Sequence, residues 1–275
     1  MKFITKRIKI IIIFLLALIF IFFCFYQNNH ISITTINLSS SKINDDITFI
    51  QISDLHGKSF GKNNTKLIKN IDKINPDFIC VTGDMFTRND DKGRQIAQNL
   101  LSNLAKKYQV FFVRGEHDGD KDFINTIKNN NVNVLSYDKK TISIKNTKID
   151  LYGISTVDYS ESYNLYNEFD KVNEKNYNIL LAHVLNPTAF AAFLPDLVLS
   201  GDTHGGQIRF PFIGSFFYKN IWFPKFNYKQ KIYDKGLYLE DDVNMYVSSG
   251  LGNYPYDIRL FNYPEIAVFK VTQGG

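Results

Sequence analysis

Residues 47–56 read ITFIQISDLH, a short apolar run that passes directly into a polar block containing Asp54 and His56. An apolar run of this length, bounded by polar residues, is typical of a strand that is buried on both faces. The same order recurs at DFICVTGD (77–84), QVFFVRGEHD (109–118), YNILLAH (177–183) and DLVLSGDTHGGQ (196–207). Open α/β sheets place their ligand sites at the carboxyl edge of the strands, so we expect the five polar blocks to meet there.

Amphipathic segments separate these strands. Residues 62–74 carry apolar side chains on one helical face, residues 93–107 have the same spacing, and residues 123–128 form a shorter segment. Pro187 opens one more short helix, because proline is favoured in the first helical turn. Three further segments are expected to contain strands: Ile31–Leu38 as a first strand or tether, 132–155 as short strands, and the tail from Lys229 as a meander. This alternation predicts an α/β fold.

The polar blocks contain four of the five histidines of the chain, each placed beside carboxylates or glycines. Oxygen and imidazole ligands suit divalent Mn, Fe, Zn or Mg, and the mixture does not choose among them. Two such ions about 3.5–4 Å apart can bind a phosphoester and lower the pKa of a water held between them, which requires a bridging carboxylate. The blocks therefore predict a two-metal hydrolase site at the strand ends.

The order of the blocks resembles a known family. They match Asp-x-His, Gly-Asp, Gly-Asn-His-Asp/Glu, a lone His and Gly-His-x-His, which is the pattern of the calcineurin-like metallophosphoesterase superfamily, over about Ile47–Val271. The words THGGQ at 203–207 and GLG…IRLF…PEI at 250–266 resemble its membrane-anchored bacterial branch. The resemblance implies a four-layer αββα sandwich, with two central sheets flanked by helices and the metals at the strand ends.

The resemblance also implies roles, carried over by motif position. It implies seven metal ligands, which are Asp54, His56, Asp84, Glu116, His183, Asp202 and His204. Asp54, His56 and His204 would hold one ion. Glu116, His183 and Asp202 would face the other, and Asp84 would lie between the two. His117 would contact the phosphate and assist the leaving oxygen, with Asp118 orienting its ring, while a hydroxide between the metals attacks phosphorus in line.

Two positions depart from the family pattern, and both concern the second metal. Glu116 stands where the family has Asn, and Asp202 stands where it has the first His of Gly-His-x-His. The extra carboxylates should favour hard ions such as Mn or Mg, with Mn preferred, and should weaken attraction to dianionic monoesters more than to diesters. Because Glu is longer than Asn and Asp is shorter than His, the two changes are expected to compensate each other.

An alternative follows from the same departures. A second site that no longer binds metal would leave a non-catalytic protein that captures a phosphorylated ligand on one ion. Against this alternative, Glu116 and Asp202 are both still competent metal ligands.

Charge and cysteine content exclude other classes of protein. The net charge is +5, but Lys2, Lys6, Arg7 and Lys9 account for four of these charges, so no nucleic acid partner is expected. Cys24 lies in a hydrophobic run and Cys80 in a strand-like one, which predicts neither an intramolecular disulfide nor a zinc–thiolate site.

Residues Ile10–Tyr26 carry no charge and are about long enough to cross a bilayer. A cleaved signal is the alternative, but no small-x-small site follows the run, and two phenylalanines before Cys24 make a poor lipobox. The basic residues on its N-terminal side predict a single-pass anchor with the N-terminus inside and the rest outside the cytoplasm. The expected organisation is an anchor at 1–27, a linker and first strand at 28–46, and a metallophosphoesterase domain at 47–275.

Residues 209–233 contain ten aromatic and five basic side chains. Such a mixture favours a membrane interface or a lipid head group. We expect either that these rings pack over the sheet edge or that the segment dips into the bilayer beside the site and admits a lipid-linked or cell-envelope phosphoester.

Overall fold

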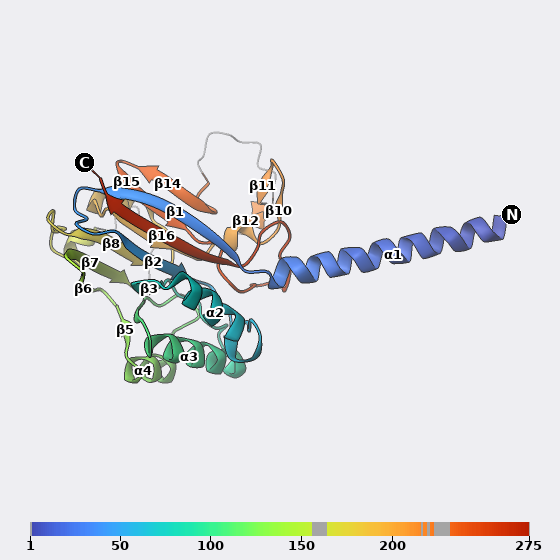
Figure 1. Cartoon of the computed structure of the whole chain (residues 1–275), viewed down its shortest axis with the longest axis horizontal. Helices are drawn as coiled ribbons and strands as arrows, with labels where there is room; N and C mark the ends of the chain where they lie inside the picture. The colour runs from blue at the N-terminus through green and yellow to red at the C-terminus, as the bar shows by residue number, and fades with distance from the viewer. Residues whose placement is uncertain (1, 156–163, 216, 219–220, 223–231, 275) are drawn as a thin grey trace.

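The computed structural model describes residues 2–155, 164–215, 217–218, 221–222 and 232–274, and its centre is a pair of stacked six-stranded sheets (Figure 1). The first sheet contains, in spatial order, β1 (Ser32–Ser40), β16 (Glu265–Gln273), β2 (Ile47–Ile52), β3 (Phe78–Val81), β4 (Gln109–Phe112) and β5 (Val132–Val134). The second contains β14 (Gly236–Glu240), β15 (Val243–Val247), β9 (Leu197–Ser200), β8 (Tyr177–Ala182), β7 (Thr147–Ile154) and β6 (Asp138–Ile144).

The strands that precede the polar blocks are parallel within each sheet. β2, β3, β4 and β5 pair in parallel, and so do β7, β8, β9 and β15. Across the two sheets, the Gln51 side-chain amide donates to the carbonyl of Ser200 at 2.9 Å. The carboxyl ends of the two sets of strands therefore lie together, as the sequence predicts.

Helices cover the outer face of both sheets. One hydrophobic cluster, which includes Phe49, Phe111 and Leu151, fills the space between the sheets. A second joins the first sheet to α2 (Thr65–Ile74), α3 (Asp91–Ala105) and α4 (Lys121–Asn129), and a third joins the second sheet to α5 (Pro187–Phe193). The predicted four-layer αββα sandwich is confirmed.

The strand β2 shows why these residues form a central strand. Successive side chains of a strand point to opposite faces, so Phe49 enters the cluster between the sheets while Ile50 and Ile52 enter the cluster under the helices. Both faces are covered, which explains the nearly continuous apolar run.

Side-chain caps set the helix starts. The carboxylate of Asp90 accepts from Gly93 N–H and that of Asp120 from Phe123 N–H, so α3 and α4 each begin two residues before the predicted start. The side chain of Asn186 caps α5, with Pro187 in its first turn as predicted. Short 3-10 turns complete the set: η1 (Lys62–Asn64), η2 (Leu165–Asn167) and η3 (His204–Gly206).

The C-terminal tail differs from the predicted meander. β14 and β15 form a hairpin at the edge of the second sheet, but β16 then crosses to the first sheet and inserts between β1 and β2. β1 pairs in parallel with β16 along its whole length, so the segment expected as a strand or tether is an edge strand. The tail thus ties the two sheets together.

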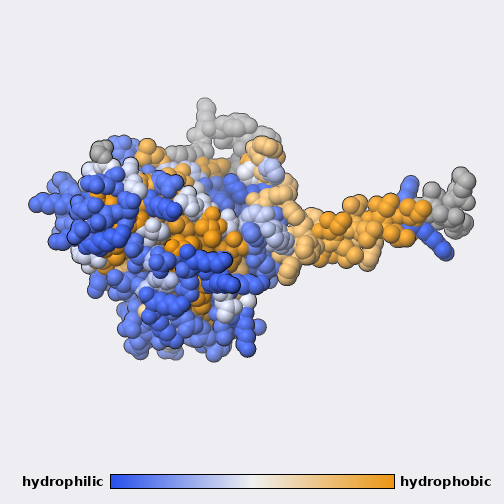
Figure 2. Space-filling model, viewed as in Figure 1, coloured by the Kyte–Doolittle hydropathy of each residue, from blue (hydrophilic) through white to orange (hydrophobic). Residues whose placement is uncertain are grey.

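The helix α1 (Lys2–Asn29) projects from one end of the domain. Its stretch Lys6–Asn29 is long and apolar enough to cross a membrane. Figure 2 shows this apolar helix standing clear of the domain, with further apolar surface at its base. Two small hairpins complete the fold: β10 (Arg209–Phe210) with β11 (Gly214–Ser215), and β12 (Phe217–Tyr218) with β13 (Ile221–Trp222).

Candidate metal centre

The backbone at the strand ends turns sharply to present the predicted ligands. Five of them have φ angles between 46° and 71°, and these are Asp54, His56, Asp84, Asp202 and His204. Left-handed φ values are uncommon outside glycine and cluster at functional sites, although Asp and His tolerate them better than most residues. Three of the five blocks, at 54–56, 83–84 and 201–207, are therefore held in conformations that an ordinary loop would avoid.

Three overlapping groups of side chains at this edge could each hold a metal ion: Asp54 with His56 and His204, Asp54 with Asp84 and His183, and His56 with Asp84 and His117. Asp84 Oδ2 lies 3.3 Å from His183 Nε2 and 3.8 Å from His56 Nε2. Asp54 Oδ1 lies 3.8 Å from His204 Nε2 and 4.0 Å from His183 Nδ1. Asp54 and Asp84 each belong to two of these groups. A carboxylate placed in this way could contact two neighbouring ions.

The donor set fits a divalent cation. The Nε2 atoms of His56 and His204 face each other at 3.2 Å, so at most one proton fits between them. The buried Oδ2 of Asp54 has no hydrogen-bond partner among the described residues. Burial lowers the pKa of His56 to about 3, and burial and His56 together hold the pKa of His204 well below its usual range. Neutral imidazole is the form that binds metal, and a cation would offset the cost of these crowded lone pairs.

The carboxylates respond to the same burial. Burial raises the pKa of Asp54 to about 7, since this carboxyl is fully enclosed and lies near Asp84. Burial also opposes ionisation of Asp84, but His183 and His56 outweigh it and keep the pKa of Asp84 below its usual range. A bound cation would stabilise both carboxylates in the charged form.

The two departures from the family pattern occupy different places. Glu116 is exposed and Asp202 is half-buried, and neither belongs to the three groups found in the described part of the chain. Asp202 nonetheless borders the centre, because its N–H donates to Asp54 Oδ1 at 3.1 Å. Burial lowers the pKa of His183, but the charges of Asp84, Asp54 and Asp202 outweigh burial and raise that pKa well above its usual range. The backbone carbonyl of Glu116 accepts from the guanidinium of Arg88.

The structure gives Asp118 partners other than the ring of His117 that the resemblance implies. Its fully buried carboxylate accepts from three backbone N–H groups, those of Asp84, Met85 and Gly115. His117 is instead oriented by the N–H of Arg88, which donates to Nδ1 at 3.0 Å. Asp118 thus holds together the two loops that carry Asp84 and His117.

Replacing Asp118 by alanine is expected to destabilise the protein by about 3 kcal/mol or more, because it leaves three buried N–H donors without an acceptor. Urea unfolding of the full chain in detergent measures this loss. Asp122→Ala, at an exposed carboxylate in the first turn of α4, is the matched control and should leave the stability nearly unchanged. Equal stability of the two variants would contradict this role of Asp118.

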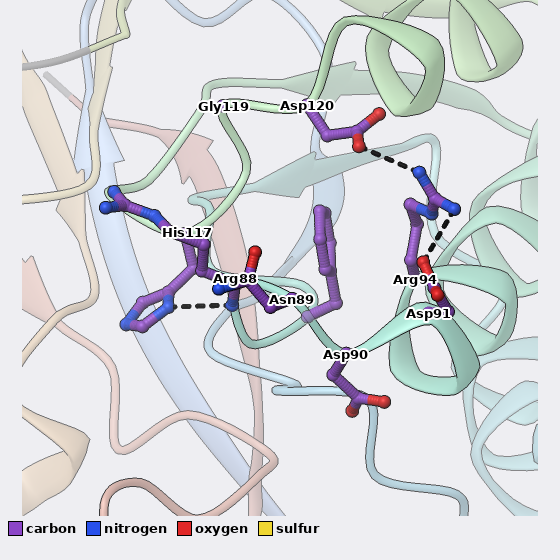
Figure 3. Close-up of a pocket in the computed structure, with 9 residues that line it drawn as sticks. Arg88, Asn89, Asp90, Asp91, Arg94, His117, Gly119 and Asp120 are labelled. Carbon is purple, nitrogen blue, oxygen red and sulfur yellow. Dashed lines mark hydrogen bonds and ion pairs between the residues drawn. The ribbon is translucent and has the colours of Figure 1, made fainter.

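His117 lies at one end of a cleft of about 420 Å³ (Figure 3). The cleft lies between the loop after β3 and the loop before α4, and it is lined by Phe86, Arg88, Asn89, Asp90, Asp91, Arg94, His117, Gly119 and Asp120. Arg94 pairs with Asp91 and Asp120 at the far end, both at 2.8 Å. The cleft offers room beside His117 for the organic part of a phosphoester.

Two residues at the centre were not predicted. The ring of Tyr254 stacks on His56 at 4.8 Å and meets His117 edge-on at 4.6 Å. Arg259 is fully buried, and its guanidinium donates to the carbonyls of Ser249 and Gly252 behind the centre. The IRLF segment on which the family resemblance partly rests includes Arg259, but its spacing predicts no role for this residue.

Residues 47–206, more than half of the chain, match the family model for calcineurin-like phosphoesterases. The chain belongs to the calcineurin-like phosphoesterase family. It is a metallophosphoesterase and therefore a hydrolase, as predicted.

Relatives of this metallophosphoesterase occur in bacteria and in an animal. It is 28% identical to the metallophosphoesterase F40B5.2 of Caenorhabditis elegans over 83% of this chain, and spans 49% of that longer protein. It is 27% identical to the uncharacterized metallophosphoesterase YkuE of Bacillus subtilis, covering 82% of this chain and 79% of YkuE. It is 26% identical to the phosphodiesterase YaeI of Escherichia coli, covering 72% and 71%. Among solved structures, the phosphopantetheinyl hydrolase PptH of Mycobacterium tuberculosis aligns at 12% identity and a TM-score of 0.44, over 79% of this chain and 96% of that chain.

Proposed function

We propose that this protein is a membrane-anchored phosphodiesterase that works with two divalent ions, Mn²⁺ being favoured. The observation that carries the proposal is the pair of acids, Asp54 and Asp84, that each belong to two overlapping groups of candidate ligands in one buried centre. Asp54, His56 and His204 would hold one ion, and His183 with Asp202 the other, with Asp84 between them. Bound there, the ions would supply positive charge to the phosphate and lower the pKa of a water molecule.

The protein's own hydrogen bonds prepare the histidines for these roles. His183 Nδ1 lies 2.7 Å from the carbonyl of Thr82, which fixes the proton on Nδ1 and leaves Nε2 free to bind a cation. At His117 the order is reversed: Nδ1 accepts from Arg88 N–H, so the proton of the neutral ring is on Nε2. That nitrogen lies 4.0 Å from Asp84 Oδ2, on the side of the centre, where it can donate to a leaving oxygen.

The choice of a diester rests on charge. Asp54, Asp84 and the adjacent Asp202 concentrate negative charge at one edge of the sheets, which opposes a dianionic monoester more than a monoanionic diester. The relative YaeI is itself called a phosphodiesterase. Oxygen-rich sites also suit Mn²⁺.

A position at the membrane is supported by the apolar surface near α1. Phe210, Phe212 and Ile213 of the β10–β11 hairpin are exposed, and this hairpin lies at the end of the domain from which α1 leaves. Exposed Phe261 packs against Phe23 of α1, with ring centroids 5.6 Å apart. Aromatic side chains at a helix end favour the lipid interface, which would bring a lipid-linked or cell-envelope phosphoester close to the centre. Residues 216, 219–220 and 223–231 of the aromatic segment lie outside the described residues.

Hydrolysis of bis(p-nitrophenyl) phosphate by the full chain in detergent, with added Mn²⁺, tests the catalytic part of the proposal. Turnover that disappears on chelation, with two ions per chain by elemental analysis, would support it. One ion per chain without turnover would instead favour the non-catalytic binder.

Orientation is tested by labelling whole cells with a membrane-impermeant maleimide. Lys140→Cys, on the exposed edge strand β6, should react in intact cells, and Lys6→Cys, before the apolar run, should react only after lysis. The reverse pattern would overturn the outward orientation.

The departures at 116 and 202 lead to a separate prediction for metal affinity. Asp202→Ala is expected to weaken Mn²⁺ binding about 10- to 100-fold, because it removes a carboxylate whose charge acts on the candidate ligand His183. Glu116→Ala should change it less than about threefold, since the charge of Glu116 is exposed. Titration calorimetry with Mn²⁺ measures both, and equal losses would restore Glu116 to the ligand role that its motif position predicts.

A further inference from the structure

The C-terminal end of α1 is joined to the domain through the side chain of Asn28. Its Oδ1 accepts from Arg259 N–H at 2.8 Å and from Asn253 Nδ2 at 2.9 Å, while its Nδ2 donates to the carbonyl of Arg259 at 3.3 Å. The backbone carbonyl of Asn28 accepts from Lys58 Nζ at 2.6 Å. The side-chain amide of Asn28 also donates to the carbonyl of Cys24 in its own helix, and exposed Asn29 makes the equivalent bond to the carbonyl of Phe25, its one side-chain bond among the described residues.

The loop of residues 252–259, to which Asn28 is hydrogen-bonded, lies against the metal centre. Arg259 Nε donates both to the carbonyl of Gly252 at 2.9 Å and to Asn253 Oδ1 at 3.0 Å. Gly252 N–H in turn donates to the carbonyl of Asp54 at 2.6 Å. A Cβ on Gly252 would lie only 2.0 Å from the carbonyl oxygen of Leu55, so the loop approaches this backbone as closely as glycine permits.

The same loop carries the aromatic wall of the centre. Tyr254 follows Asn253 directly, and its ring lies nearly parallel to that of His56, at an interplanar angle of 10°. The side-chain amide of Gln207 donates to the carbonyl of Tyr254 at 2.6 Å. Asn28 therefore reaches two candidate metal ligands that are 26 residues or more away in sequence. Three hydrogen bonds connect it through Arg259 and Gly252 to Asp54, and two contacts connect it through the Asn253–Tyr254 backbone to His56.

We infer that Asn28 is a positioning residue, through which the end of the membrane helix holds the loop 252–259 and its Tyr254 against the centre. The inference rests on the proposed function for its rate measurement, because it assumes turnover at this centre. The anchor then forms part of the active site's support and is more than a tether.

Three variants of the full chain in detergent test this role. Asn28→Ala removes both acceptor bonds and is expected to lower kcat, and the affinity for Mn²⁺ alone, about 10- to 100-fold, as loss of an outer support of a metal site does. Asn28→Asp keeps an acceptor for Arg259 N–H and Asn253 Nδ2, so it should restore both quantities to within about threefold of the original chain. Asn29→Ala is the matched control and should change neither.

Equal behaviour of Asn28→Ala and Asn29→Ala in both measurements would overturn the inference. If the unsubstituted chain binds Mn²⁺ but does not turn over substrate, the proposed function fails, and the Mn²⁺ affinities alone then decide the role of Asn28. Should Asn28→Ala not fold, Asn253→Ala removes one bond to Asn28 Oδ1 and is measured in its place. An Mn²⁺ affinity equal to that of Asn29→Ala would again count against the inference.

Discussion

Asp84→Asn is expected to lower hydrolysis of bis(p-nitrophenyl) phosphate about 10³-fold and to reduce the number of bound ions below two per chain. Asp84 belongs to two of the three candidate groups and lies 3.3 Å from His183 and 3.8 Å from His56. A carboxylate that would hold both ions supports several kcal/mol of charge stabilisation in the transition state, and each 1.36 kcal/mol is about tenfold in rate. The amide oxygen of asparagine can still accept from His117 N–H, which Asp84 Oδ1 does at 2.9 Å, so the fold should survive.

The matched control for this variant is Asp150→Asn. Asp150 is also a fully buried carboxylate, but it lies in β7 and pairs with Lys139 and Thr141, away from the centre. The Asp150→Asn variant should lose stability, but it should keep its turnover per folded chain and its bound ions. Turnover of Asp84→Asn within about tenfold of the original chain would remove Asp84 from the bridging role, because a loss that small is about 1.4 kcal/mol.

The strands and the place of the site could be predicted because their signal is local. A strand covered on both faces must be apolar along its length, and β8 spans Tyr177–Ala182 as the run YNILLA predicts. Polar residues at the ends of parallel strands then meet without any knowledge of the loops. Asp84 lies between groups of candidate ligands, where its motif position predicts it, whereas the second group that contains Asp54 had no signal in the sequence.

The role of Asp118 could not be predicted, because a carboxylate beside a histidine looks in sequence like the partner of its ring. The chain folds so that Asp118 points back to the N–H groups of Asp84 and Met85, more than 30 residues earlier. Glu116 shows the opposite case, in which the motif position predicts a ligand and the backbone leaves the side chain in solvent. Both outcomes depend on which way one loop turns.

The link between α1 and the centre has no local signal either. Asn28 and Arg259 are 231 positions apart, and they meet because β16 crosses between the sheets and pairs with β1, the strand that follows α1. Nothing in the composition of the tail predicts that crossing, since an edge hairpin and a central strand share the same apolar alternation. Long-range pairing of this kind places Asn28 beside the loop 252–259.

His117→Gln is expected to lower kcat about 10²- to 10⁴-fold without changing the number of ions per chain. The Arg88 N–H bond to Nδ1 leaves the proton on Nε2, so His117 is prepared to donate a hydrogen bond to the leaving oxygen rather than to bind a cation. Its membership in a group with His56 and Asp84 favours the rival role of a ligand, which would cost the variant an ion. Elemental analysis of the purified variant separates the two roles.

The leaving group provides a second, independent readout for His117. Hydrogen bonding to the leaving oxygen matters little when that oxygen is already a stable anion, as in p-nitrophenolate, and matters more for a basic alkoxide. A hydrogen-bond donor at position 117 therefore predicts a larger loss with an alkyl diester than with bis(p-nitrophenyl) phosphate. A ligand at that position would lower both rates equally, since the ion serves both substrates. Equal losses together with a missing ion would assign His117 to the metals, and the cleft beside Arg88 would then need another group to protonate the product.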